Sequence, residues 1–456
     1  MENTREVMPG RRKLLLGLFL SVFGVAFEMI GIATALPTVM AQFEASHLYA
    51  WAFSTFIIGQ LLSTMLAGRL ADRRGPLPPM LAGFALFLTG LVVATLAPSV
   101  WLLLLARFIQ GLGAGGLNLS LYVTIAMVFS GPERSTVLGW ISFIWLLPAF
   151  VGPPLAAGLT TITWRLVFAL MVPFLLVAAA LALPSMRRVQ QTFRPGESTP
   201  GVAWWAILMV SVAPGFIQLA GEGLGIWSAV AAVVGVLGLV LGLGRVMPPA
   251  IRLLGRGLGA VVTSRALQAG SFFAAEAFLL LVLKELRGLS PLQAGLVLTI
   301  GSVSWSLGAW LQSRAWIRLR RDQLISTGTA LVLFGLLVIV GFIQWEWPVL
   351  VALSGWLFAG LGMGVQLPST AVATMDLSGA HEQGANNAGL QLAEGLGNAL
   401  MTAIAGAIYA ALLPALHSSF LAVFVMLAGL CALGLLVTLR IGPIQNSSLR
   451  EPAVNG

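Results

Sequence analysis

Long apolar runs recur along the whole chain, and they constrain its fold more than any other feature. Many of these runs approach or exceed the ~20 residues that a helix needs to cross a bilayer. Of the 456 residues, 58% are hydrophobic and only 9% are charged. The runs are too long and too uniformly apolar for the alternating strands of a membrane barrel. The sequence therefore predicts an all-helical integral membrane protein.

The spacing of the apolar runs predicts fourteen membrane spans. Their approximate limits are 13–37, 48–70, 78–98, 100–128, 135–160, 164–184, 203–220, 224–245, 258–284, 291–313, 322–343, 348–372, 384–412 and 417–440. Pro214 interrupts the first member of the pair within 203–245, so this pair could instead form a re-entrant hairpin that leaves twelve crossings. The pair adds either two crossings or none. The later spans therefore have the same orientation under both alternatives.

The basic residues predict how the spans are oriented. Most of the 25 lysines and arginines fall in the two tails and in the loops that follow even-numbered spans. Retained positive charge marks the cytoplasmic side. We therefore expect a multi-pass protein of a bacterial inner membrane with both termini in the cytoplasm. The formal net charge of +9 is a topology signal, because the sequence contains no soluble basic domain that would bind nucleic acid.

The stretch AGRLADRRGPLPP, between the second and third spans, concentrates charge in a chain that is otherwise poor in it. It resembles the signature loop of the major facilitator superfamily, Gly-x-Leu-x-Asp-Arg-x-Gly. The matching positions are Gly68, Leu70, Asp72, Arg73 and Gly75. Pro76 and Leu77 stand where that family has two basic residues. The resemblance implies that this loop braces the two halves of the protein on the cytoplasmic side.

Three further motifs follow in the order that the family has. RFIQGLGAGG at 107–116 resembles its Arg-x-x-Gln-Gly motif in the fourth span. Gly139, Gly152 and Pro153 partly match the pattern associated with antiporters in the fifth span. RGLSPLQAGL at 287–296 resembles a loop of the fourteen-span drug/proton antiporter branch.

The glycines of the fourth span also match a dinucleotide-binding pattern, which requires a preceding strand that is not expected here. Gly111 and Gly115 are four residues apart, and we expect them instead to let another helix approach closely.

An internal repeat supports two halves that run in the same direction across the membrane. Residues 107–116 align with WLFAGLGMGV from 356 at an offset of 249, and Glu133 and Glu382 share that offset. Parallel halves of this kind, with the binding site between them, occur in secondary transporters. We predict a six-helix bundle at 1–188, a linker with two extra transmembrane helices at 189–257, and a second six-helix bundle with a cytoplasmic tail at 258–456.

Three acids lie inside predicted spans, where ionisable groups are costly and usually functional. Glu28 and Glu276 are 248 residues apart, which places them at nearly matching positions in the repeat, and Glu394 is the third. Each could exchange a proton during transport or form a permanent structural pair. The depths of Glu28 and Arg107 differ by roughly 5 Å, so these two can pair. Arg265 lies near the cytoplasmic edge, which favours an interfacial anchor.

Polar side chains share helix faces in two of the spans. Asn387, Gln391, Glu394 and Asn398 follow one face of the thirteenth span, and Arg107, Gln110 and Asn118 form a thinner stripe in the fourth. We expect them to face a central cavity, or alternatively to form hydrogen bonds between helices. The aromatic residues that could line a pocket for an apolar substrate are Trp145, Phe272, Phe273, Phe278 and Trp305.

Together these features predict a proton-coupled secondary transporter that exports hydrophobic or amphipathic compounds by alternating access. We expect a monomer in the lipid bilayer that takes a lipophilic small molecule and protons, and uses the proton gradient with no cofactor. The alternatives within this fold are an exporter of lipids or metabolites and a proton-coupled importer.

Two other classes of protein fit the sequence less well. A membrane-embedded enzyme would need clustered nucleophiles, bases or metal ligands, whereas His47, His381 and His417 are scattered. We expect no catalytic residue and no metal site, and the sequence has no Gly-rich loop with Lys-Ser or Lys-Thr for ATP. A channel would not explain parallel halves with paired acids.

Overall fold

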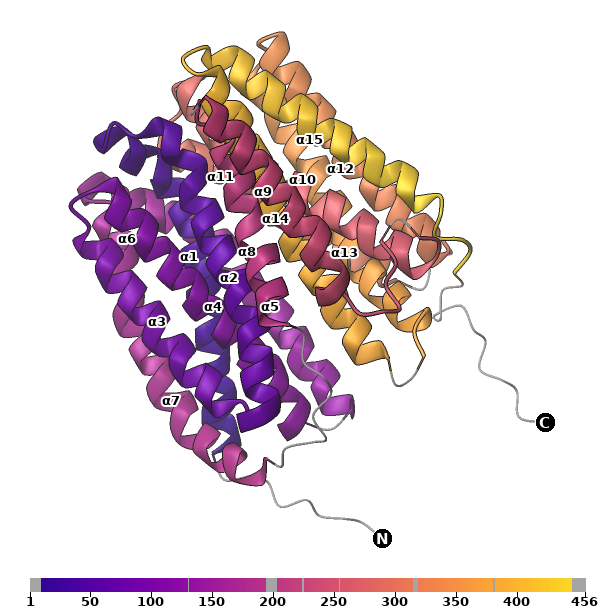
Figure 1. Ribbon diagram of the computed structural model, residues 1–456. Helices are drawn as coiled ribbons and strands as arrows, with labels where there is room; N and C mark the ends of the chain where they lie inside the picture. The colour runs from indigo at the N-terminus through magenta and orange to yellow at the C-terminus, as the bar shows by residue number, and fades with distance from the viewer. Residues whose placement is uncertain are drawn as a thin grey trace. The chain divides into compact units, whose positions relative to one another are not determined.

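The computed structural model describes residues 10–129, 131–193, 203–223, 225–253, 255–314, 319–379 and 382–444. His381, the side chain of Trp145 and the two chain ends predicted to be cytoplasmic, 1–9 and 445–456, lie outside the described residues. All regular structure in the described ranges is helical (Figure 1). The elements are α1 (Arg11–Gln42), η1 (Ser46–Leu48), α2 (Tyr49–Arg74), α3 (Leu77–Leu96), α4 (Val100–Val128), α5 (Gly131–Ile162), α6 (Arg165–Ala169), α7 (Met171–Thr192), α8 (Trp204–Leu219), α9 (Ile226–Val246), α10 (Leu258–Glu285), α11 (Pro291–Gln312), α12 (Arg321–Gln344), α13 (Val349–Asp376), α14 (Gln383–Leu412) and α15 (Leu416–Thr438).

Each predicted span coincides with a helix, and the sixth is divided into α6 and α7. In the described chain, 12 helices are long and apolar enough to cross a membrane. Helix α5 has 32 residues, whereas α8 has only 16, which is short for the ~30 Å hydrocarbon core. The prediction of an all-helical membrane protein is confirmed. Helices are favoured because a bilayer offers no water to bond exposed backbone groups.

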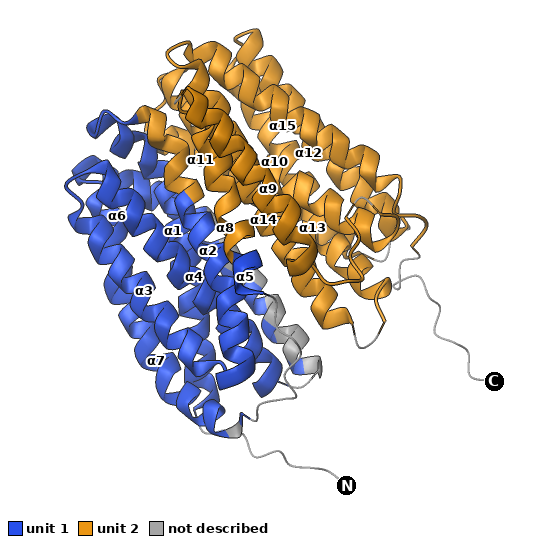
Figure 2. Ribbon diagram, in the orientation of Figure 1, with its two compact units in different colours: residues 1–45, 55–207 blue, residues 46–54, 208–456 orange. Residues whose placement is uncertain are grey.

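The chain divides into two compact units (Figure 2). Unit 1 comprises residues 1–45 and 55–207, and unit 2 comprises residues 46–54 and 208–456. The short segment 46–54, which comprises η1 and the first residues of α2, therefore packs with unit 2. Helices α8 and α9 belong to unit 2 as well, apart from the first residues of α8.

The same helix pairs pack inside each unit, as an internal repeat requires. In unit 1, α1 packs on α5 and α7, and α3 packs on α4. In unit 2, α10 packs on α14 and α15, and α12 packs on α13. These partners correspond to one another at the sequence offset of about 249, so the predicted repeat is confirmed in the packing.

Glycines let the fourth helix of each repeat approach two neighbours. A Cβ atom at Gly111 or Gly115 would overlap the backbone of α2, and one at Gly113 would overlap the backbone of α3. The expected close approach at Gly111 and Gly115 is thus confirmed. The counterparts on α13, at the same offset, are Gly360, Gly364 and Gly362, and they contact α11 and α12 in the same pattern.

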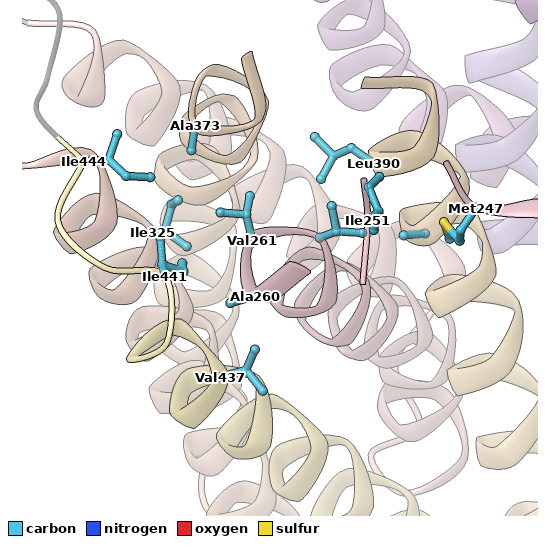
Figure 3. Close-up of a cluster of buried hydrophobic side chains, with 12 residues drawn as sticks. Met247, Ile251, Ala260, Val261, Ile325, Ala373, Leu390, Val437, Ile441 and Ile444 are labelled. Carbon is cyan, nitrogen blue, oxygen red and sulfur yellow. The ribbon is translucent and has the colours of Figure 1, made fainter. Parts of the chain in front are cut away.

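An apolar cluster in unit 2 joins the connection after α9 to α10, α12, α13, α14, the end of α15 and the segment that follows it (Figure 3). Its buried members are Met247, Ile251, Ala260, Val261, Val262, Ile325, Ala373, Leu390, Ala393, Val437, Ile441 and Ile444. Because these side chains come from distant parts of the chain, the cluster holds the connection 247–257 against the helices of unit 2.

Candidate functional site

Glu28 and Arg107 form a buried ion pair inside unit 1. Glu28 lies on α1 and Arg107 on α4, and their side chains are only 1% and 2% exposed. The same Arg107 nitrogen donates to Gln110 Oε1 at 3.0 Å, and the guanidinium lies 4.5 Å from the centre of the Phe56 ring. The similar depths along α1 and α4 had allowed this pairing, and the structure places the two groups in contact.

Two buried polar atoms at this ion pair, Glu28 Oε2 and Gln110 Nε2, have no hydrogen-bond partner among the described residues. A buried pair with a charge on each side is costly to break, because removing one partner leaves an uncompensated charge. The pair is therefore well suited to hold α1 against α4, and its second carboxylate oxygen can still accept a hydrogen bond.

Glu276 on α10 lies one residue before the position that matches Glu28 at the offset of 249, and it has a different environment. Its side chain is half-buried, and within the described residues it makes no ion pair or hydrogen bond. At the offset of 249, the position of Arg107 is occupied by Trp356. Trp356 is fully buried and stacks on Phe272 of α10, with ring centres 4.7 Å apart. The second half of the repeat thus has an aromatic ring in place of the guanidinium, and no cation in the described part of the chain contacts Glu276.

Arg265 and Glu394 form a second ion pair, between α10 and α14. Arg265 Nη2 lies 2.6 Å from Glu394 Oε2, and Nε donates to the same oxygen at 2.9 Å. The other guanidinium nitrogen, Nη1, donates to the Leu367 carbonyl at 2.7 Å and to Thr370 Oγ1 at 2.8 Å.

The expectation that Arg265 is an interfacial anchor is therefore wrong. Its side chain is only 7% exposed, and that of Glu394 is 20% exposed. The guanidinium turns inward because polar partners on α13 and α14 complete its hydrogen bonds, and a position near a span end does not reveal those partners.

Aromatic rings surround Phe272 one helical turn before Glu276. The Phe272 ring centre lies 5.6 Å from Phe273 and 5.6 Å from Trp305, in addition to the stack on Trp356. Phe273 and Trp305 are only partly buried. The repeat alignment matches Trp356 with Arg107, and this match was the signal in the sequence that could have identified Trp356 as part of the site. Phe278 belongs to another cluster, with Tyr49 and Tyr409.

The predicted polar stripes occupy different surroundings. Gln110 is fully buried. Asn118 and Ser21 both line a cavity of ≈ 10 Å³, which has room for about one water molecule. On α14, Gln391 is exposed, whereas Asn387, Glu394 and Asn398 are half-buried. Asn398 Oδ1 accepts from Thr402 Oγ1 at 3.3 Å. Their role in binding a substrate remains a prediction.

The loop after α2 is held by α7. Gly75 adopts the left-handed conformation with φ of 80°, which ends α2, and a Cβ there would meet the Gln190 side chain. Gln190 Nε2 donates to the Arg74 carbonyl at 2.6 Å, and Gln190 Oε1 accepts from the Leu77 backbone at 3.2 Å. Gly68 lies six residues before the end of α2 and is partly buried, while Asp72 and Arg73 are exposed.

The predicted antiporter-type residues lie on α5. Gly152 and Pro153 are buried, and a Cβ at Gly152 would contact Ile30 of α1 at 3.6 Å. Gly139 lies nearer the start of the same helix. Pro153 has no backbone N–H, so one helical hydrogen bond is missing at the position where α5 crosses α1.

Sequence patterns gave no signal for the polar contacts of the segment 46–54. The Tyr49 hydroxyl donates to the Ala277 carbonyl at 2.6 Å, directly after Glu276. Trp51 Nε1 donates to Glu222 Oε1 at 2.7 Å, in the turn between α8 and α9. Both contacts join residues more than 150 positions apart, so neither follows from local spacing.

A family profile and several curated proteins match the chain. Residues 15–282 match the profile of the Major Facilitator Superfamily. The efflux pump dotC of Dothistroma septosporum is 36% identical over 160 residues, which are 35% of this chain and 27% of that relative. The chain thus matches less than a third of the length of that relative.

Two bacterial relatives match over most of the chain. The multidrug efflux pump SdrM of Staphylococcus aureus (strain N315) is 24% identical, over 92% of this chain and 95% of the relative. The multidrug transporter protein MdtP of Bacillus subtilis (strain 168) is 21% identical, over 90% of this chain and 77% of the relative.

Solved structures match the fold at low sequence identity. A peptide transporter POT in complex with sulfate has a TM-score of 0.70 at 19% identity, covering 94% of this chain and 95% of the other. A D-xylose-proton symporter has a TM-score of 0.64 at 17% identity, covering 95% of this chain and 97% of the other. These likenesses concern the fold alone.

Proposed function

The chain belongs to the Major Facilitator Superfamily of membrane transporters, and from this premise we propose that it is a proton-coupled exporter of hydrophobic or amphipathic compounds. It works as a monomer by alternating access, in a bacterial inner membrane with both termini in the cytoplasm. The proton gradient supplies the energy, and no cofactor takes part.

The observation that carries this proposal is the contrast among the three acids that lie within the predicted spans. Glu28 and Glu394 are each in contact with an arginine, whereas Glu276 has no cation partner among the described residues. A carboxyl group without an ion pair can bind and release a proton without first losing a salt bridge. Proton coupling is therefore assigned to Glu276, and the other two acids mainly hold helices together.

The surroundings of Glu276 support a lipophilic substrate. The rings of Phe272, Phe273 and Trp305 lie one turn away on α10 and on the adjacent α11. Aromatic faces bind apolar and cationic groups without demanding one hydrogen-bond pattern. The names of the two bacterial relatives that match most of the chain, a multidrug efflux pump and a multidrug transporter, point in the same direction.

In the proposed cycle, a proton and the transported compound compete for the carboxylate of Glu276. When Glu276 is ionised, its negative charge favours an amphipathic cation whose apolar part lies on the aromatic rings. Protonation from the outer side neutralises Glu276, which weakens that interaction and releases the compound. Release of the proton to the cytoplasm restores the carboxylate for the next molecule. A ligand shifts the equilibrium between the two access states only by its differential affinity for them.

The test is transport into proteoliposomes across an imposed pH gradient, with lipophilic cations, neutral drugs and lipids as the panel. Glu276→Gln keeps the size of the side chain but removes the titratable proton. We expect gradient-driven transport to fall to the background of protein-free liposomes. Equilibrium exchange of the compound should persist at a reduced rate, because the neutral side chain weakens binding of a cation but leaves the contacts with the aromatic rings.

The matched control is Glu285→Gln, an acid on the same helix next to Lys284, which is expected to retain transport. Glu28→Gln and Glu394→Gln are expected to lower the rate but to leave the dependence on the gradient. Gradient-driven transport that persists in Glu276→Gln would overturn the assignment.

A further inference from the structure

A cavity of ≈ 380 Å³ lies beside the end of α9 in unit 2. This volume is within the range of small-molecule sites in proteins. The cavity is separate from the acids and aromatic rings of α10 described above. Its lining residues are Leu239, Val240, Leu243, Gly244, Met247, Ile251, Arg252 and Leu253.

The lining combines an apolar wall with one cationic group. Six of the lining side chains are aliphatic or Met, and Gly244 leaves open space, since a Cβ there would meet nothing within 4 Å. The Arg252 side chain is exposed and makes no hydrogen bond or ion pair with the described residues. A long apolar surface that ends at an available guanidinium matches a molecule with an apolar chain and an anionic head.

All charged residues in the sequence near the cavity-lining segment are basic. Arg245, Arg252 and Arg256 are all exposed, and no Asp or Glu occurs between Glu222 and Glu276. Basic pockets at the ends of transmembrane helices are suited to anionic lipid head groups. The predicted topology places this end of α9 at the cytoplasmic surface of the membrane.

One wall of the cavity is firmly held, and another is open toward lipid. Ile251 and Met247 belong to the apolar cluster of unit 2, and Gly257 N donates to the Arg440 carbonyl at 3.1 Å (Figure 3). In contrast, α9 exposes most of its apolar surface, with Val240 at 70%. A pre-formed site beside a lipid-exposed helix is directly accessible from the bilayer.

We propose that this cavity binds an anionic phospholipid, whose acyl chain lies along the apolar wall and whose phosphate contacts Arg252. The proposal is independent of the substrate and of proton coupling. It assigns a structural lipid to α9, which has no counterpart in the repeat, and to the connection that follows it.

The experiment uses the full-length protein in phosphatidylcholine nanodiscs with a trace of phosphatidylglycerol that carries a photoreactive acyl chain. We expect cross-linking to the peptide that contains residues 239–253. Unlabelled phosphatidylglycerol should compete, and phosphatidylcholine and inorganic phosphate should not. Arg252→Gln should lower the affinity for phosphatidylglycerol about fivefold, and this should reduce both the cross-link and the competition by unlabelled phosphatidylglycerol. Gly244→Leu should fill the cavity and abolish the cross-link.

Two matched variants serve as controls. Arg187→Gln removes an exposed arginine at another helix end, and Gly429→Leu adds the same side chain at another open helical glycine. Both are expected to keep the parental cross-link. Equal competition by phosphatidylcholine would show non-selective lipid contact, and competition by inorganic phosphate would show a free-anion site. Either result, or an unchanged cross-link in Arg252→Gln, would overturn the proposal.

Discussion

At the scale of single residues, one difference between the two repeats changes the chemistry of the acids. Arg107 and Trp356 occupy matching positions on α4 and α13. The guanidinium contacts Glu28, whereas the indole stacks on Phe272, and Glu276 has no cation partner among the described residues. Two carboxylates at nearly matching positions therefore have different surroundings, and this supports the proposal that Glu28 is structural and Glu276 titrates.

The buried pair of unit 1 predicts strong coupling between its two residues. Arg107→Met leaves the Glu28 carboxylate buried without its cation, and we expect a loss of about 3–5 kcal/mol of stability. The double variant with Glu28→Gln should regain most of it, because no uncompensated charge remains. Thermal unfolding of the four proteins in detergent measures the coupling. Simple addition of the two single effects would contradict the prediction.

The loop after α2 predicts a penalty at one glycine. Gly75→Ala forces a side chain into the left-handed conformation and toward Gln190, and we expect a cost of about 1–2 kcal/mol. The midpoint of thermal unfolding should fall. Gly429→Ala, in a helix with open space around it, should cause no fall. An equal response of the two variants would argue against backbone strain at Gly75.

At the scale of helices, packing is controlled by glycines that recur at the repeat offset. Gly111, Gly113 and Gly115 on α4 each lie against the backbone of α2 or α3. Small residues are used in this way because apolar side chains gain little from leaving lipid, so close backbone contact supplies the attraction. The matching triplet on α13 shows that this packing solution is used in both units.

Larger side chains at these helix contacts are expected to disrupt packing. Gly113→Leu on α4 and Gly362→Leu on α13 each insert a side chain into a neighbouring backbone, at a cost of about 1–3 kcal/mol or more. Gly158→Leu on α5 is the control, since nothing lies within 4 Å of its Cβ position. Yield of folded protein by size-exclusion chromatography gives the comparison. Normal yield of both test variants would refute the packing argument.

At the scale of the whole molecule, the distribution of arginines predicts which loops face the cytoplasm. The loops after even-numbered spans hold most of the basic residues, and the loop between α12 and α13, like the one between α3 and α4, holds none. Such charge asymmetry sets orientation during insertion. Two parallel halves in one membrane follow from this pattern and from the repeat.

Single cysteines test this topology. The chain has one cysteine, the buried Cys431, so Cys431→Ser gives a background without cysteine. With a membrane-impermeant maleimide on intact cells, Pro98→Cys and Glu346→Cys should react. Arg187→Cys and Ser313→Cys should react only after the membrane is permeabilised. All four positions are exposed, so access to the residue itself is not limiting. The reverse labelling pattern would disprove the orientation.

The sequence by itself determined the helical membrane fold, the positions of the spans and the repeat. The physical reason is that a bilayer forces each apolar run of sufficient length to satisfy its own backbone hydrogen bonds. The signature loop and the glycine spacing are likewise local patterns. The acids inside spans could also be identified from the sequence, because an ionisable residue within an apolar run stands out from its neighbours.

Only the tertiary structure decided which of those polar groups meet. The pairing of Arg265 with Glu394 joins residues 129 positions apart, and Gln190 reaches the loop after α2 from α7. Tyr49 likewise binds the carbonyl next to Glu276 from a different part of the chain. Helix periodicity gives the face of a side chain but not the identity of the neighbouring helix. Partners across helices are set by packing, which no local spacing encodes.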